Sequence, residues 1–260
     1  MLENFTLIAG PCTLQSSELN LEIGGHLAKI SRDLNIPVIF KASFDKANRS
    51  KLDSARGPGL ESGLVLLSEV KEKTGLPVLT DVHEPWQARE VSPVADILQV
   101  PAFLARQTDL LVAVGKTHKP VNIKKAQWMS HIELKGALDK VRGSDNSEVM
   151  VTERGTFFGY GDLVVDMRNF QMIKDELLCP VYFDGTHSIQ KPGQRSGSTG
   201  GTPGFTEPLV LAAVGAGCDG LFLEVHPKPE TAPSDGMTMM PLNRLHNLLI
   251  KVLNLRKALR

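Results

Sequence analysis

Short apolar, β-branched runs alternate with longer segments of helical period along the whole chain. The strand-like runs are predicted at 5–9, 38–41, 78–81, 97–100, 121–124, 149–153, 181–184 and 221–225. Segments with apolar residues at helical spacing lie between them, for example over 19–34, 60–73, 110–116 and 209–216. Strands that alternate with helices in this way are typical of a parallel sheet with crossover helices.

Four prolines mark the beginnings of predicted strands. Pro37, Pro77, Pro120 and Pro180 each stand directly before a strand-like run, where the missing N–H of proline is tolerated. Eight strands of similar length in 260 residues, with no dinucleotide-binding glycine fingerprint, favour a closed barrel over an open doubly wound sheet. We therefore predict an α/β fold, a (β/α)8 TIM barrel, that forms a single domain over residues 1–260.

Composition narrows the class of protein. Hydrophobic residues make up 42% of the chain and charged residues 22%, which predicts a packed core rather than disorder. Lys plus Arg and Asp plus Glu number 29 each, so we expect no nucleic-acid or membrane partner. The three cysteines, Cys12, Cys179 and Cys218, are far apart and indicate a reducing compartment. We predict a cytoplasmic location.

Polar residues stand where the predicted strands end. In (β/α)8 barrels the chemistry lies at the carboxyl ends of the strands, and each strand in turn supplies one candidate. The eight candidates, in chain order, are Cys12, Lys41, Asp81, Gln99, Lys124, Arg154, His187 and Glu224. Because chance does not readily produce such a series, we predict that the site lies at this end of the barrel.

Three of these candidates are cations on otherwise apolar strands. Lys41, Lys124 and Arg154 would repel one another at one barrel mouth unless an anion were bound there. The alternative is that each cation pairs with a carboxylate such as Glu153 or Asp81. The loop after the second strand adds further donors suited to phosphate oxygens, namely Lys46, Asn48, Arg49 and Ser50. We therefore expect a phosphorylated ligand.

A second set of residues offers sulfur, nitrogen and oxygen donors. It comprises Cys12, His187, Glu224 and Asp235, which a closed barrel could bring together because its last strand lies beside its first. A divalent metal ion such as zinc, iron or manganese accepts this mixed set. The alternatives are a small buried residue at Cys12 and a substrate hydrogen bond from His187.

Six stretches of the sequence resemble the 3-deoxy-D-manno-octulosonate 8-phosphate synthases. They lie at 8–12, 40–50, 99–103, 106–109, 152–155 and 184–188. The run Lys-Ala-Asn-Arg-Ser at 46–50 is the most specific, because the related 3-deoxy-D-arabino-heptulosonate 7-phosphate synthases typically carry a Lys-Pro-Arg-Thr type of run there. The resemblance covers about residues 5 to 245.

This resemblance implies a transferase, 3-deoxy-8-phosphooctulonate synthase. Such an enzyme condenses phosphoenolpyruvate with D-arabinose 5-phosphate and water, giving 3-deoxy-D-manno-octulosonate 8-phosphate and inorganic phosphate on the way to the inner-core sugar of lipopolysaccharide. The alternatives are a heptulosonate phosphate synthase that uses erythrose 4-phosphate and a non-catalytic sugar phosphate sensor. The resemblance also implies a homotetramer.

The resemblance further implies a role for each matching residue. Phosphoenolpyruvate would be bound by Lys41, Lys46, Gln107, Lys124 and Arg154. Arabinose 5-phosphate would be bound by Asn48, Arg49, Ser50 and Asp81, with Arg49 and Ser50 on its distal phosphate and reaching toward the active site of a neighbouring subunit. The catalytic residues would be Lys46, Cys12, His187 and Asp235.

The residue at position 12 separates two branches of that family. Members with Cys there use a divalent metal and members with Asn do not, so the resemblance implies metal binding by Cys12, His187, Glu224 and Asp235. Two features depart from the family pattern. Gly185 stands where Ala or Val is expected before Thr-His, and the loop 196–204 is rich in Gly and Thr and is expected to be mobile.

Overall fold

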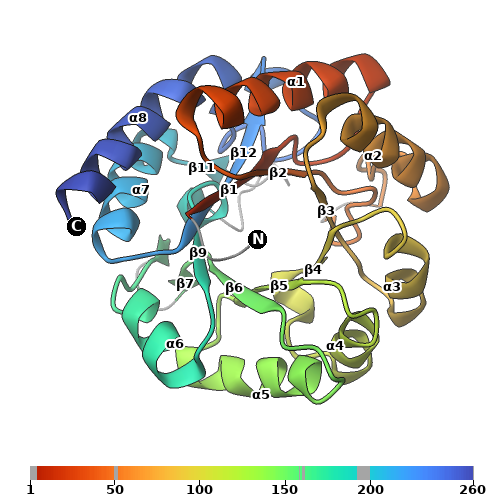
Figure 1. Cartoon of the computed structure of the whole chain (residues 1–260), viewed down its shortest axis with the longest axis vertical. Coiled ribbons are helices and arrows are strands. Elements are labelled where there is room, and N and C mark those ends of the chain that lie inside the picture. The colour runs from red at the N-terminus through yellow and green to blue at the C-terminus, as the bar shows by residue number, and fades with distance from the viewer. Residues whose placement is uncertain (1–4, 50–51, 158, 160–161, 192–199, 260) are drawn as a thin grey trace.

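The computed structural model of the chain is a closed barrel of parallel strands inside a ring of helices (Figure 1). It describes residues 5–49, 52–157, 159, 162–191 and 200–259. The barrel strands are β1 (Thr6–Gly10), β2 (Val38–Lys41), β3 (Val78–Asp81), β4 (Ile97–Val100), β5 (Val121–Lys124), β6 (Val149–Glu153), β9 (Val181–Asp184) and β12 (Gly220–His226). They pair in this order, and β12 closes the barrel on β1. The predicted (β/α)8 barrel is confirmed.

The strand boundaries follow the prediction closely. Six of the eight barrel strands have the predicted ends. β1 begins and ends one residue later than predicted, and β12 is one residue longer at each end. The carboxyl end of β12 is held by a short parallel strand, β13 (Met240–Pro241), which pairs with Val225 and His226.

The helices cover the outside of the barrel (Figure 1). They are α1 (Ser17–Leu34), α2 (Leu60–Thr74), α3 (Pro85–Val91), α4 (Thr108–Gly115), α5 (His131–Arg142), α6 (Asn169–Leu177), α7 (Thr206–Gly215) and α8 (Leu242–Ala258). All four helical segments named from the sequence are present, with ends that differ from the prediction by at most three residues. Helix α1 starts before its first apolar residue because the Ser16 hydroxyl accepts a hydrogen bond from the Leu19 N–H and caps the first turn.

Side-chain alternation along the strands separates two apolar layers. One layer fills the barrel interior and includes Met150, Tyr182 and Phe222. The other lies between the strands and the helices and includes Ile123 and Val151. Because successive strand residues point to opposite faces, the residue after each strand end faces predictably inward to the mouth or outward to the helices.

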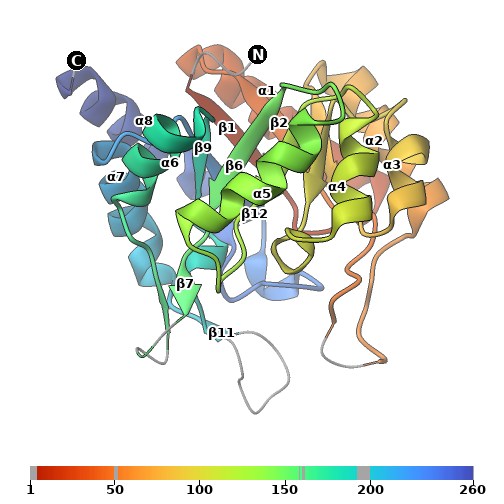
Figure 2. The same ribbon diagram turned by 90° about the horizontal axis from the view of Figure 1, so that it is seen from below.

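Two antiparallel hairpins and several short 3-10 turns extend from the carboxyl end of the barrel (Figure 2). The hairpins join β7 (Thr156–Phe157) to β8 (Leu163–Val164) and β10 (Gln190–Lys191) to β11 (Gly200–Gly201). The 3-10 turns are η1 (Ala102–Leu104), η2 (His187–Ile189), η3 (Pro203–Phe205) and η4 (Pro229–Thr231). Of the loop 196–204, residues 196–199 lie outside the described residues. The rest comprises β11, Thr202 and the first two residues of η3.

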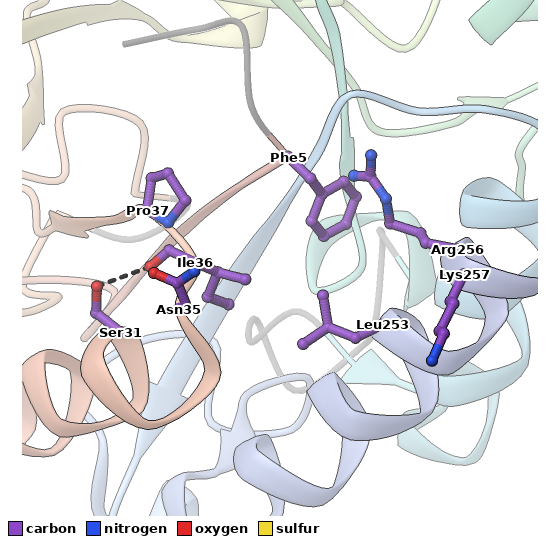
Figure 3. Close-up of a pocket in the computed structure, with 8 residues that line it drawn as sticks. All are labelled: Phe5, Ser31, Asn35, Ile36, Pro37, Leu253, Arg256 and Lys257. Atoms are coloured by element: carbon purple, nitrogen blue, oxygen red, sulfur yellow. Dashed lines mark hydrogen bonds between the residues drawn. The ribbon is translucent and has the colours of Figure 1, made fainter. Parts of the chain in front are cut away.

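A surface pocket of about 790 Å³ lies at the opposite end of the barrel (Figure 3). Its lining includes Phe5 and Pro37, which precede strands β1 and β2, and Arg256 in the last turn of α8. The guanidinium of Arg256 packs over the Phe5 ring at 4.0 Å. Because polar groups at the amino end of such a barrel usually serve stability, the active site is expected at the other end.

None of the helices in the described part of the chain combines the length and the apolar character that crossing a membrane requires.

We predict that the barrel does not accommodate a methyl group at Gly220, the first residue of β12. An added Cβ would lie 2.3 Å from the Tyr182 ring and 2.4 Å from the Thr6 carbonyl oxygen. Gly220→Ala should therefore lower the free energy of unfolding by about 1–3 kcal/mol, measured by urea denaturation. The control is Gly136→Ala in α5, where nothing lies within 4 Å of the new Cβ. Equal stability of the two variants would contradict the prediction.

Candidate active site at the carboxyl end of the barrel

Buried cations gather at the carboxyl ends of the strands. Lys41 ends β2, Lys124 ends β5, and Arg154 follows β6; these side chains are almost fully buried, as is Lys46 in the next loop. Lys41 Nζ donates to Glu224 Oε1 at 3.0 Å and lies 4.0 Å from Asp81 Oδ1. Lys46 Nζ lies 4.0 Å from the same Glu224 oxygen. The predicted cationic mouth is thus assembled around a buried carboxylate.

Lys124 has a carboxylate partner of its own. Its ammonium group donates to Asp184, which ends β9, and also lies 3.4 Å from the centre of the Phe222 ring. Arg154 forms no ion pair with the carboxylates of the described residues; it donates to Gln190 Oε1 at 2.6 Å and to the His187 carbonyl at 3.3 Å. Its Nη1 atom is buried and has no hydrogen-bond partner among the described residues, so this nitrogen is available to an anion.

The alternative of carboxylate pairing therefore applies to Lys41 and Lys124. The partners are mainly Glu224 and Asp184 rather than the carboxylates considered from the sequence. Asp81 contributes a longer contact to Lys41, whereas Glu153 points away from the mouth and pairs with Lys125.

The paired charges shift the acidity of the groups at the mouth. Burial opposes ionisation of Asp184 and Glu224, but electrostatic attraction to neighbouring basic groups holds the pKa of each carboxyl below its usual value. These groups are His187 and Lys124 for Asp184, and Lys41 and His187 for Glu224. Burial, together with repulsion from Arg154 and Lys41, lowers the pKa of Lys124 to about 8 despite its bond to Asp184.

Lys46 shows the opposite balance. Burial alone would lower its pKa, but the acidic groups around it, Cys12 first and then Glu224 and Asp81, raise the pKa above the usual lysine value. Lys46 is therefore held as a cation at neutral pH.

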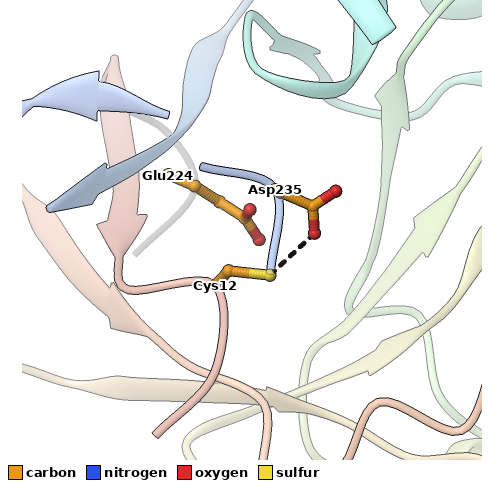
Figure 4. A group of neighbouring side chains, drawn as sticks. All are labelled: Cys12, Glu224 and Asp235. Carbon is orange, nitrogen blue, oxygen red and sulfur yellow. Dashed lines mark hydrogen bonds between the residues drawn. The ribbon is translucent and has the colours of Figure 1, made fainter. Parts of the chain in front are cut away.

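Cys12, Glu224 and Asp235 form a compact group of metal-ligand types (Figure 4). Their ligand atoms all lie within 4.8 Å of one another, and the Cys12 thiol donates to Asp235 Oδ2 at 3.0 Å. Asp235 is brought there by a left-handed turn with φ of 56°, a conformation that aspartate tolerates better than most residues. Glu224 Oε2 is buried and has no hydrogen-bond partner among the described residues.

This group fits a divalent metal ion. Thiolate and carboxylate are both ligands of zinc and of related transition metals, and an orphaned carboxylate oxygen is costly unless something binds it. Burial and the charge of Glu224 raise the pKa of the Cys12 thiol, so the thiol stays protonated without a cation. A bound metal would favour the thiolate.

His187 lies beside this group but outside it. Its Nδ1 atom is 2.8 Å from Asp184 Oδ2, and its Nε2 atom is 3.6 Å from Glu224 Oε2. Asp184 Oδ1 also accepts the backbone N–H of His187 at 2.8 Å. A carboxylate on one ring nitrogen commonly orients a histidine toward a metal with the other nitrogen. His187 Nε2 therefore faces Glu224, but His187 is not a member of the compact group formed by Cys12, Glu224 and Asp235.

The resemblance assigns four residues to arabinose 5-phosphate, and the structure brings only some of them to the barrel mouth. Arg49 donates to Ser234 Oγ at 2.7 Å, and Ser234 donates to Asp235 Oδ2 at 2.6 Å. Asp81 accepts from Ser43 and lies 3.1 Å from His83 Nε2. Asn48 and Gln107 are exposed, and Ser50 lies outside the described residues.

Sequence reasoning missed three residues that shape the mouth: Asp184, Phe222 and Gln190. Asp184 could have been found, because it is the last residue of its strand and an acid in an apolar run, but the residue predicted for that strand end is His187, which lies in η2. Phe222 is an inward apolar residue of β12, and Gln190 lies in a loop strand. Neither of these two carries a polar signal at a strand end.

Comparisons with known proteins identify the family of this chain and several of its relatives. A family model described as the DAHP synthetase I family matches residues 3–260. The chain is 48% identical over 256 residues to 2-dehydro-3-deoxyphosphooctonate aldolase of Syntrophobacter fumaroxidans, covering 98% of this chain and 88% of the relative. It is 50% identical over 247 residues to the protein of that name from Fusobacterium nucleatum, covering 95% and 88%. It is 50% identical over 243 residues to that of Legionella pneumophila, covering 94% and 88%.

We predict that Cys12→Ala loses most of the metal that the wild-type protein binds, because one ligand atom of the group is removed. The affinity for zinc or manganese should fall about tenfold or more, measured as metal content after loading and gel filtration. Cys179→Ala is the matched control, since Cys179 is also a buried thiol but bonds to the Val149 carbonyl at the amino end of β6. Equal metal content in all three proteins, or none in the wild type, would refute the metal assignment.

Proposed function

The chain belongs to the DAHP synthetase I family, and we propose that it condenses phosphoenolpyruvate with D-arabinose 5-phosphate and water, giving 3-deoxy-D-manno-octulosonate 8-phosphate and inorganic phosphate. It is a transferase, and its relatives at 48–50% identity are named 2-dehydro-3-deoxyphosphooctonate aldolase. Those names do not favour the heptulosonate alternative or the sugar phosphate sensor. We propose that the product serves the inner-core sugar of lipopolysaccharide.

The observation that carries this proposal is the set of buried cations at the mouth. Two phosphorylated substrates bring several negative charges into one site, and buried cations are the groups that offset this charge. Lys124 and Arg154 are proposed to hold phosphoenolpyruvate, with Lys41 beside them. The unpartnered Nη1 of Arg154 supports this role. Gln107 is exposed, and its proposed contact with phosphoenolpyruvate rests on the family resemblance alone.

The aldose phosphate is proposed to lie on the side of Lys46. Asn48, Arg49 and Ser50 would bind it, with the Arg49 guanidinium on the distal phosphate and Asp81 near the sugar hydroxyls. Arg49 donates to the Ser234 hydroxyl at 2.7 Å. A phosphate oxygen is a stronger acceptor than a neutral hydroxyl, so the substrate would compete for this contact.

The proposed reaction begins with carbon–carbon bond formation. The methylene carbon of phosphoenolpyruvate attacks the aldehyde carbon of the sugar, and the aldehyde oxygen takes up a proton to become a hydroxyl. Water adds to the cationic carbon that remains, and loss of a proton gives a hemiketal phosphate. This collapses with cleavage of the carbon–oxygen bond and releases inorganic phosphate.

Lys46 is proposed to act between the two substrates. Its raised pKa keeps it protonated, which suits electrostatic stabilisation of the aldehyde oxygen as negative charge develops there. A water molecule beside it could then deliver the proton, because a lysine of high pKa is a weak general acid.

A divalent metal is proposed as the cofactor, held by Cys12, Glu224 and Asp235 with His187 as a further ligand. Zinc, iron and manganese all accept this donor set. When bound, such an ion supplies Lewis acidity toward a carbonyl oxygen or a water molecule. Cys12, His187 and Asp235 would then belong to the catalytic machinery with Lys46.

The remaining properties are also proposals. One catalytic domain over residues 1–260 and a homotetramer fit the family resemblance. The exposed rings of Phe103 and Trp128 pack against each other, 5.9 Å apart, beyond the ends of β4 and β5, where a neighbouring subunit could cover them. Three unpaired buried cysteines are compatible with a reducing compartment such as the cytoplasm.

The function is tested by measuring phosphate release from phosphoenolpyruvate on metal-supplemented protein. Arabinose 5-phosphate and erythrose 4-phosphate are compared side by side, and we expect strong preference for arabinose 5-phosphate. A preference for erythrose 4-phosphate would move the chain to the heptulosonate reaction. Binding of sugar phosphate without release of phosphate would support the sensor.

We predict that Lys124→Ala and Arg154→Ala each raise the KM for phosphoenolpyruvate more than tenfold, a loss of about 1.4 kcal/mol or more. Each substitution removes a cation from the proposed phosphate and carboxylate contacts. The measurement is steady-state phosphate release at saturating arabinose 5-phosphate. Lys116→Ala, which removes an exposed lysine at the end of α4, is the control and should leave the KM unchanged. A residue whose variant keeps the wild-type KM does not bind phosphoenolpyruvate.

A further inference from the structure

A second pair of charged residues lies directly behind the phosphate-binding cations. Lys125 follows Lys124 in the chain, and Glu153 precedes Arg154. On β5 and β6 the outward residues include Ile123 and Val151, which belong to the layer between strands and helices. Strand alternation therefore directs Lys125 and Glu153 outward, away from the mouth, while their neighbours point into it.

Lys125 is fully buried and makes an unusually complete set of contacts. Its ammonium group lies 3.4 Å from Glu153 Oε1 and donates to Thr156 Oγ1 at 3.0 Å. It also donates to three backbone carbonyls at 3.1–3.3 Å, those of Ala126, Met129 and Gly155. One side chain thereby joins the loop that follows β5 to the turn that follows β6.

Glu153 fixes the same turn from the other side. It is also fully buried. Its Oε1 accepts the Gly155 N–H at 2.6 Å, and its Oε2 accepts from Asn169 Nδ2, at the start of α6, at 2.7 Å. Gly155 has a φ of 89°, a left-handed conformation that glycine adopts without a steric penalty. Arg154 thus lies in the chain between Glu153, whose two carboxylate oxygens both accept hydrogen bonds, and Gly155, whose backbone is also hydrogen-bonded.

Fold stability alone does not account for this pair. Removing two charges from water costs free energy that their attraction often fails to recover, and apolar residues of similar volume commonly serve stability as well. A buried pair with every polar atom bonded does, however, fix geometry. The geometry fixed here is that of the backbone that carries Lys124 and Arg154, two like charges that repel each other at the mouth.

We propose that Lys125 and Glu153 are positioning residues, which hold Lys124 and Arg154 at the separation and direction that the phosphate and carboxylate of phosphoenolpyruvate require. This proposal rests on the proposed function. Neither residue touches the substrate; each acts through the neighbour in the chain and through the two loops that it joins.

The test is the double variant Lys125→Met/Glu153→Gln, which removes both charges and nearly keeps both volumes. Because small displacements of binding groups cost large factors in rate, we expect the KM for phosphoenolpyruvate to rise at least tenfold. The KM for arabinose 5-phosphate should stay within about twofold of wild type, since the loop that carries Arg49 is not joined to this pair. Melting temperature is measured in parallel.

The control is Lys71→Met/Asp96→Asn, which removes a bonded pair, 2.7 Å apart, at the amino end of β4. It should leave both KM values unchanged. A double variant of Lys125 and Glu153 that loses melting temperature but keeps the wild-type KM for phosphoenolpyruvate would overturn the proposal and leave a structural role. If that variant fails to fold, Glu153→Gln alone, which keeps the oxygen contacts of Lys125, replaces it.

The outcome is separable from that of the proposed function. Wild-type turnover with arabinose 5-phosphate tests the function, whereas the change in KM between wild type and variant tests the positioning. Phosphoenolpyruvate binding, measured by calorimetry, supplies the same comparison without turnover. Equal dissociation constants for wild type and double variant would again count against the positioning role.

Discussion

The structure depends on a balance of buried charge at the barrel mouth. Four buried cations, Lys41, Lys46, Lys124 and Arg154, lie among three buried carboxylates, Asp81, Asp184 and Glu224, and the half-buried Asp235. An unpaired charge at such depth would cost several kcal/mol, so neither set could be buried without the other. The closed barrel makes this possible, because strands distant in the chain deliver opposite charges to one small volume.

One carboxylate connects the group of candidate metal ligands to the buried cations. Glu224 is a candidate metal ligand and also a partner of the buried cations. One of its oxygens accepts from Lys41, and the other has no hydrogen-bond partner among the described residues. A divalent cation on Glu224 and Asp235 would offset their negative charge, and the field of Lys41 and Lys46 would then act more strongly on a bound anion. A bound metal would therefore raise the positive potential of the site, which fits the proposed binding of two phosphorylated substrates.

The fold could be predicted from the sequence because parallel strands that are buried on both faces appear as short, nearly continuous apolar runs. Runs such as 38–41 and 181–184 are apolar up to their last residue and follow a proline, and their ends match the structure. The mouth was predictable to the extent that one polar residue stands at each strand end. Its pairing was not, because partners such as Lys124 and Asp184 are set by distances across the barrel.

The adjacent lysines 124 and 125 show a further limit of the sequence. They are identical in residue type, and only the strand alternation in the folded barrel sends one into the mouth and the other behind it.

Gly185 shows why a departure from a family pattern need not change a site. A Cβ at this position would lie 2.8 Å from a methyl group of Leu223 and 2.9 Å from one of Val210. These side chains fill the space that the expected Ala or Val would occupy, so the substitution is matched by packing in β12 and α7. The neighbouring ligand candidates are fixed by other contacts, since the Thr186 hydroxyl accepts the Glu224 N–H at 2.8 Å and Asp184 holds His187. The packing of Leu223 and Val210 thus compensates for the missing side chain at Gly185. The charge balance at the mouth does not depend on this substitution.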